Sequence, residues 1–216
     1  MTPFELRVSV LTPIVMPFAT PLDGLLAYAA HQLTGLTGEA LLPHIPLQRW
    51  RDNGPFHASS ARLIRPRPGR AALVGRLTPS DLEADKLHPR QRRKVDVAKG
   101  SYAARLHHYP VCDAIEARFS AVGEPDAVLS LMRLVTGLGK RAPQGMGQIG
   151  TMRVVPLADD ESLVDAQGQA ARPLPVPMYR RLTGSEPDAV ECQPFAVVPS
   201  YWEGEKVSCV MPTLFI

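Results

Sequence analysis

Cysteine is scarce in this sequence. Its 216 residues include only three, and no two of them form a C-x-x-C pair: Cys112, Cys192 and Cys209. This spacing excludes a zinc knuckle and a disulfide framework, and it is typical of a protein in a reducing compartment. Four of the six histidines are scattered without ligand spacing or acidic partners, namely His31, His44, His57 and His88. We therefore expect no metal site.

Long apolar runs are also absent. No stretch reaches the roughly 18 consecutive apolar residues that a membrane-spanning helix needs. At the amino terminus, Glu5 and Arg7 lie in an apolar run that Pro13 and Pro17 interrupt, which is unlike the charged region and unbroken apolar core of a signal peptide. We expect a soluble, cytoplasmic protein with no membrane partner. Neither a G-x-S-x-G elbow nor a phosphate loop ending in Gly-Lys-Ser/Thr is present, so the hydrolase and nucleotidase classes lose their main support.

Proline, by contrast, is abundant. There are 22 prolines, about twice the usual share, while hydrophobic residues make up 45% of the chain. This combination indicates a folded, loop-rich protein rather than a disordered one. A length of 216 residues corresponds to one large domain or two small ones.

Positive charge is concentrated in one segment. The net charge is only +3, but residues 62–105 contain twelve Lys/Arg against four Asp/Glu, and the remainder contains twelve against seventeen. A local excess of this kind favours a polyanionic ligand, commonly RNA or DNA. Tyr102 and Tyr109 border the segment and are candidates for stacking on unpaired bases. The alternative is a solvated charged surface with no ligand.

The order of expected elements predicts the fold. Apolar residues alternate with polar ones from Phe4 onward, which predicts a strand over 4–15. Thr20 as the cap and Pro21 at the first helical position predict the start of a helix over about 22–32, which Gly35 and Gly38 end. Further patterns predict strands over 55–64, 71–77 and 113–122, a helix over 124–135 and a strand over 147–157. Residues 65–70 read as a tight turn with arginines at its tip. Residues 1–158 therefore form an α+β, ferredoxin-like (RRM-like) β-α-β-β-α-β domain with a basic insertion at about 62–105. Residues 159–216 form a proline-rich, small β appendage with extended pieces at 196–199 and 206–211.

The most distinctive stretch is residues 137–150. It contains five of the sixteen glycines, two glutamines and the adjacent cations Lys140 and Arg141. Glycine allows backbone N–H groups to approach an anion, and successive N–H groups form a concave anion site. The fragment Gly145-x-Gly147-x-x-Gly150 resembles a dinucleotide fingerprint, but a true fingerprint follows a strand and opens a helix, and here the order is reversed. We therefore expect no cofactor. The alternative to a ligand-binding loop is a flexible helix-to-strand turn.

These features resemble the RAMP superfamily of CRISPR-associated proteins. The resemblance rests on the glycine-rich loop at 137–150 and on an amino-terminal strand that runs into Thr12-Pro13 and residues 21–26. The length, the basic insertion before the second helix and the proline-rich end are most similar to the small subunit that caps the crRNA 5′ handle, and within that group to the type IV effector member. The resemblance covers residues 1–158 well, and the tail fits loosely.

The resemblance implies an RNA-binding, non-catalytic subunit at one end of a crRNA-guided ribonucleoprotein, where it caps the handle and nucleates assembly. Its partners would be crRNA, a multimeric backbone RAMP subunit and a large effector subunit, with target DNA near the handle end as a further candidate. The loop contacts to RNA would be Gly137, Gly139, Lys140, Arg141, Gly145, Gly147 and Gln148. A thumb-like insertion drawn from residues 62–99 would add Arg65, Arg67, Arg70, Arg90, Arg92, Arg93, Lys94 and Lys99.

Some members of the superfamily cleave RNA without a metal, with a histidine as general acid or base and a cation or tyrosine near the 2′-hydroxyl. Here His107, His108 and Tyr109 are adjacent in the sequence, and the loop offers Lys140. The alternative function is therefore a metal-independent RAMP endoribonuclease that processes precursor crRNA.

Overall fold

The first strand, β1 (Thr2–Val10), lies inside a four-stranded antiparallel sheet. The computed structural model describes residues 1–15, 19–51, 54–75, 103–201 and 204–213. The sheet has the order β3-β6-β1-β7, with β3 at Arg62–Ile64, β6 at Glu116–Gly123 and β7 at Ile149–Pro156. Alternate side chains of β1, namely Phe4, Leu6 and Val8, are almost completely buried. The alternation in the sequence thus predicts the buried face of this strand correctly.

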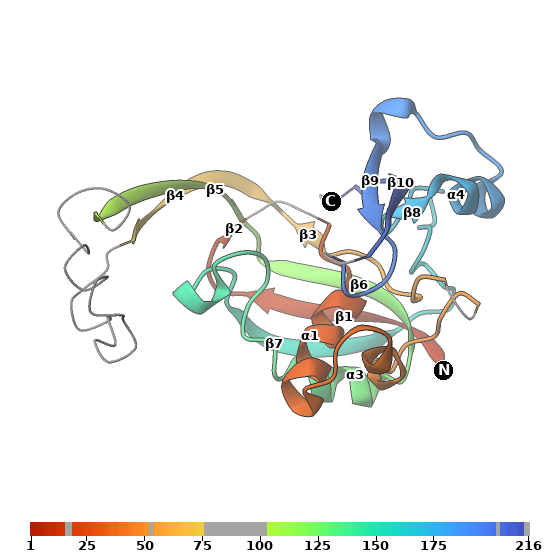
Figure 1. Cartoon of the computed structure of the whole chain (residues 1–216), viewed down its shortest axis with the longest axis horizontal. Helices are drawn as coiled ribbons and strands as arrows, with labels where there is room; N and C mark the ends of the chain where they lie inside the picture. The colour runs from red at the N-terminus through yellow and green to blue at the C-terminus, as the bar shows by residue number, and fades with distance from the viewer. Residues whose placement is uncertain (16–18, 52–53, 76–102, 202–203, 214–216) are drawn as a thin grey trace, which may run out of the picture. The chain divides into compact units, whose positions relative to one another are not determined.

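Two helices cover that apolar face. Helix α1 (Leu22–Thr34) connects β1 to β3 along the chain, and α3 (Pro125–Met132) connects β6 to β7. They lie together on one side of the sheet, and their buried residues join one core with β1 (Figure 1). A sheet of this order with both helices on one face is the split β-α-β-β-α-β arrangement, so the α+β, ferredoxin-like prediction is confirmed. None of the helices in the described ranges is long and apolar enough to cross a membrane.

The helix boundaries follow local chemistry. Helix α1 begins at Leu22 because Pro21 has extended backbone angles (φ −68°, ψ 145°), so the prediction that Pro21 is the first helical residue and Thr20 the cap is wrong. Gly35 adopts the left-handed conformation (φ 70°) and ends the helix as expected. In α3, Pro125 occupies the first turn, where its missing N–H has no cost, and Asp126 suits the positive end of the helix.

Shorter elements connect these parts. They are β2 (Ile14–Val15) and the 3₁₀ turns η1 (Gly38–His44), η4 (Ala142–Gln144) and η5 (Ala189–Glu191). The strand expected over 55–64 is reduced to β3, because the segment before it makes only isolated bridges, such as Ala58 with Ala121.

Strands β4 (Arg67–Gly75) and β5 (Arg105–Asp113) are neighbours in a second sheet. Most of this pair belongs to a compact unit of its own, Pro68–Val111, while Met1–Arg67 and Cys112–Ile216 form the other unit. The tight turn expected at 65–70 is shorter than predicted, because β4 already begins at Arg67 and contains Arg70. The expected boundary at residue 158 stays a prediction.

The carboxyl-terminal segment contains a small sheet of order β8-β10-β9 and one helix. Its strands are β8 (Leu174–Pro175), β9 (Cys192–Ala196) and β10 (Lys206–Val210). Helix α4 (Val176–Thr183) was not predicted, because the prolines before and inside it read as breaks. Proline is tolerated in the first turn, and Gly184 ends the helix in the left-handed conformation (φ 70°).

A buried ion pair joins this segment to the ferredoxin-like sheet and helices. Arg172 and Asp23 are both 0% exposed, and Nη1 of Arg172 lies 3.1 Å from Oδ2 of Asp23. The guanidinium also donates to the carbonyls of Phe56 (2.7 Å) and Val197 (3.0 Å) and to the Tyr201 hydroxyl (2.9 Å). Tyr201 in turn donates to Oδ1 of Asp23 at 2.7 Å. Burial raises the pKa of Tyr201 well above its ordinary value, so its hydroxyl keeps its proton and remains a donor.

A second polar link lies nearer the surface. His57 Nδ1 and Asp160 Oδ2 are 2.6 Å apart, and Asp160 accepts from the hydroxyl and the backbone N–H of Ser162. Partial burial opposes ionisation of Asp160, but the hydrogen bonds from His57 and Ser162 outweigh it and lower the pKa of the carboxyl. The loop after β7 is thereby fastened to the segment before β3.

We expect Arg172→Met to lower the free energy of unfolding by about 3 to 5 kcal/mol, because it leaves the Asp23 carboxylate buried without its counter-charge. Urea unfolding followed by circular dichroism measures the loss. Arg180→Met removes the exposed pair with Glu186 and is the matched control, with an expected change below about 1 kcal/mol. Equal, small losses in both variants would contradict a central role for the buried pair.

Candidate nucleic-acid interface

The glycine-rich loop folds into a compact turn between α3 and β7. Leu138 N donates to the Gly147 carbonyl at 2.8 Å, and Gly137 and Gln148 form a bridge across the base of the turn. The turn is also attached to the segment after β1. Lys140 N donates to the Val15 carbonyl at 3.2 Å, and Gly147 N donates to the Pro13 carbonyl at 2.8 Å.

Thr12 makes a further attachment at the other end of the turn. Its hydroxyl donates to the Gly145 carbonyl and accepts from Gln148 N, both at 2.8 Å. The Thr12-Pro13 pair and the glycine-rich loop were separate features of the sequence. The structure brings them into direct contact.

Most of these glycines are required by packing within the protein. A Cβ on Gly147 (φ 62°) would lie 2.0 Å from the Leu138 carbonyl oxygen, and one on Gly139 (φ 77°) would lie 2.8 Å from both Ile14 Cγ2 and the Val15 carbonyl. At Gly145 (φ 82°) a Cβ would meet no atom within 4 Å. Only the last of these three positions faces open space.

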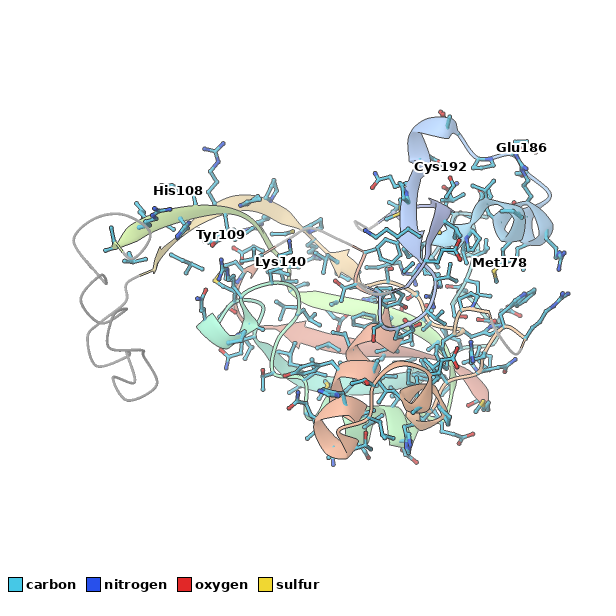
Figure 2. The ribbon with its side chains drawn as sticks, viewed as in Figure 1. His108, Tyr109, Lys140, Met178, Glu186 and Cys192 are labelled. Atoms are coloured by element: carbon cyan, nitrogen blue, oxygen red, sulfur yellow. The ribbon has the colours of Figure 1, made fainter. Side chains whose placement is uncertain are left out.

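The backbone donors of the turn are also used internally. In the described structure the N–H groups of seven residues donate to protein acceptors: Leu138, Lys140, Gln144, Gly145, Met146, Gly147 and Gln148. A concave site made from these N–H groups is therefore not formed. A ligand would be met instead by the exposed side chains of Lys140, Arg141 and Gln148. We call Lys140 and Arg141 the cationic ledge (Figure 2 labels Lys140).

Arg141 has an unusual backbone conformation. Its φ is 66°, a region that costs a side-chain-bearing residue roughly 1 kcal/mol and glycine nothing. Within the described residues, the positions other than glycine with positive φ are all arginines: Arg51, Arg65 and Arg141. A glycine would satisfy the backbone better at each, so each position keeps a cation at a cost in backbone strain.

An apolar cavity of about 560 Å³ lies beside the ledge. Its walls come from β2, α1 and the glycine-rich turn, and include Val15, Leu25, Tyr28, Val135, Lys140 and Pro143. Tyr28 is 53% exposed although it lies on a helix whose alanines at 27, 29 and 30 are buried. An exposed ring beside a cation is suited to stack on an unpaired base. Sequence reasoning missed Tyr28, because nothing in its neighbours distinguishes it from a partly buried helix residue.

The arginines at the junction of β3 and β4 form another basic region. Arg65 (φ 52°) and Arg67 are exposed, and they border a hollow of about 270 Å³ with Asp113, Ala114 and Ile115. Ile115 is exposed by 57%, so the hollow offers both positive charge and apolar surface. The structure therefore brings Arg65 and Arg67 together at the junction of β3 and β4, and not with Arg70 at the tip of one turn.

The strand pair β4–β5 carries further cations of the basic segment. Arg70 and Arg105 are exposed on it, while Arg90, Arg92, Arg93, Lys94 and Lys99 lie outside the described residues. The rings of His107 and Tyr109 share one face of β5, with centroids 6.1 Å apart. His108 is the residue between them, so it projects to the opposite face (Figure 2). The two histidines therefore do not face one common substrate position.

Two thiols are held in an inert state. Burial raises the pKa of Cys112, and it raises that of Cys209 to about 11. In the described ranges, no three His, Cys, Asp or Glu side chains gather closely enough to hold a metal ion.

Residues 74–212 match the model of the family described as CRISPR type IV associated protein Csf3. The chain belongs to this family. The match includes β6, α3, the glycine-rich turn and β7, and it extends into the carboxyl-terminal sheet, where the resemblance seen in the sequence was loose. No curated protein matches the chain. Membership in the Csf3 family makes the protein a type IV CRISPR-associated, RAMP-like protein.

We expect Gly147→Ala to destabilise the protein much more than Gly145→Ala. Both substitutions place alanine at positive φ, at a cost of about 1 kcal/mol, but only the first adds a clash with the Leu138 carbonyl. We expect a loss of about 3 kcal/mol for Gly147→Ala and about 1 kcal/mol for Gly145→Ala. Thermal and urea unfolding measure the two values. Similar losses would show that the turn is not packed as described.

Proposed function

We propose that this protein is the RNA-binding subunit of a type IV CRISPR crRNA-guided effector complex, and that it recognises and caps the crRNA 5′ handle and nucleates assembly. The observation that carries the proposal is the cationic ledge. Two adjacent exposed cations sit on a turn that is fastened to β2, and Lys140 also lines the apolar cavity. Membership in the Csf3 family supports an RNA-guided context for this site.

The ledge and the cavity have complementary chemistry. Lys140 and Arg141 are suited to phosphate groups, and the Tyr28 ring and apolar walls are suited to one unstacked base. Because the turn is held by hydrogen bonds to Pro13 and Val15, little order has to be gained when RNA binds. A rigid phosphate-and-base site of this size is appropriate for a defined RNA end.

The β4–β5 pair supports contacts with RNA or a neighbouring subunit. Both of its faces are largely exposed, and Val74 (68%) and Leu106 (58%) are large apolar side chains in solvent. A strand pair with both faces exposed buries little apolar surface of its own, so a covering partner would stabilise it. The proposed partners are crRNA, a multimeric backbone RAMP subunit and a large effector subunit, with target DNA near the handle end as a further contact.

A crRNA-processing endoribonuclease is the second candidate function. The observation in its favour is the His107–Tyr109 pair, whose rings share an exposed face of β5. A histidine and a tyrosine on one face offer a general acid or base and a hydroxyl.

Handle binding is tested with Arg141→Gly and Lys140→Ala. We expect each to weaken binding of handle RNA by about tenfold at low salt and to reduce the slope of log affinity against log salt by about 0.7 per lost phosphate contact. Arg141→Gly separates function from folding, because glycine accepts φ 66° without strain and the free energy of unfolding stays within about 1 kcal/mol of the parent. Fluorescence anisotropy at several salt concentrations measures the affinity.

Arg181→Ala, an exposed cation on α4, is the control for a general loss of charge and should leave handle affinity unchanged. Affinity that stays the same in both ledge variants at every salt concentration rules out the ledge as the handle site.

Cleavage is tested by incubating the purified protein with precursor crRNA in EDTA. We expect the RNA to be bound and to remain intact, as a capping subunit requires. Cleavage that His107→Ala abolishes and His108→Ala leaves unchanged would replace the capping proposal with the endoribonuclease, because the two histidines lie on opposite faces of β5.

A further inference from the structure

The register of the main sheet aligns four arginines in one row. Arg7 on β1 lies opposite Arg118 on β6 and, on the other side, opposite Arg153 on β7. Arg118 lies opposite Arg62 on β3. Since Leu6 and Val8 point into the core, Arg7 and its partners project from the face away from α1 and α3. We call Arg62, Arg118, Arg7 and Arg153 the arginine row.

Like charges directly opposite one another destabilise a sheet, so the row requires compensation. Two glutamates supply it from positions two residues along the central strands. Glu5 Oε1 lies 2.6 Å from Arg7 Nε, and Glu116 Oε1 lies 2.7 Å from Arg118 Nε. The outer arginines share the same carboxylates at longer distances, 3.9 Å for Arg62–Glu5 and 3.6 Å for Arg153–Glu116.

The compensation is incomplete. Glu161 also lies 3.9 Å from Arg62, so four guanidinium groups face three carboxylates. The two edge members differ most in exposure, with 14% for Arg62 on β3 and 65% for Arg153 on β7, while Arg118 (31%) and Arg7 (26%) between them are similar. The excess positive charge is therefore accessible at the β7 edge. There the Arg153–Glu116 pair, at 3.6 Å, is longer than the Arg7–Glu5 and Arg118–Glu116 pairs.

We propose that the arginine row binds the phosphate backbone of a nucleic-acid strand without reading its sequence. The more exposed members, Arg118, Arg7 and Arg153, lie on adjacent strands about 4.8 Å apart and so span roughly 10 Å, which suits a ligand with anions repeated along a line. All four cations are arginine, whose planar group binds phosphate in a bidentate manner.

The rest of this face supports a backbone contact. Its other side chains on β1, β6 and β7 include Glu5, Ser9, Glu116, Ser120 and Thr151, and the strands place no aromatic ring there. Without rings, the face has no platform for stacking bases, and phosphate contacts alone position a strand without specifying it. The site is distinct from the cationic ledge, so it does not depend on handle recognition.

The test uses a 20-nucleotide oligouridine without a handle, measured by fluorescence anisotropy in protein that carries Lys140→Ala and Arg141→Gly. Arg153→Gln should weaken binding about fivefold and lower the salt slope by about 0.7. Glu116→Gln should strengthen binding by about twofold, because it releases Arg118 and Arg153 from their shared carboxylate. Arg133→Gln, an exposed cation after α3, is the control with unchanged affinity.

Opposite changes in the Arg153 and Glu116 variants support the row as a nucleic-acid site. Unchanged affinity in both overturns it, as does an equal loss with Arg133→Gln, which would indicate a general effect of net charge. Loss of assembly with the other effector subunits in Arg153→Gln, with oligouridine binding unchanged, also overturns the proposal and assigns the row to an acidic protein surface. If the affinity for handle RNA is unchanged by the ledge substitutions, the capping function is rejected and the proposal for the arginine row is not affected.

Discussion

The guanidinium group of Arg172 is the interaction on which the arrangement of the main compact unit depends. It has no contact with solvent, so its charge has to be matched inside the protein, and Asp23 of α1 provides the match. The same group binds backbone carbonyls before β3 and after β9, which ties three distant segments to one point. A proline-rich tail with helix α4 and a small sheet thereby becomes part of the ferredoxin-like unit.

In the glycine-rich turn, the glycines serve packing and the cations stay exposed. Gly139 and Gly147 allow the turn to pack against residues 13–15, and this packing leaves Lys140 and Arg141 on the exposed side. The glycines therefore contribute rigidity more than access to backbone donors. A rigid turn loses little entropy when its cations meet a ligand, which is the property that a recognition site for a defined RNA end requires.

The two faces of the main sheet also have different roles. One face carries the apolar residues that α1 and α3 cover, and the other carries the arginine row with Glu5 and Glu116 between its members. The glutamates neutralise most of the repulsion among the arginines. The proposed functions use the cations that this arrangement leaves exposed, Lys140 and Arg141 on the turn and Arg153 at the sheet edge.

The sequence alone determined the alternation of β1, the helix and strand around the glycine-rich loop, the α+β class and the RAMP resemblance, because each depends on local periodicity or on order along the chain. The tertiary structure decided what depends on distant partners. Asp23 and Arg172 are 149 residues apart, and no local pattern pairs them. The alignment of Arg7 with Arg118 and Arg153 depends on strand register. The role proposed for Tyr28 depends on the cavity beside it, and α4 forms because a first helical turn accepts proline. Periodicity specifies which face of an element is buried, whereas the choice of its neighbours is made by packing of the whole chain.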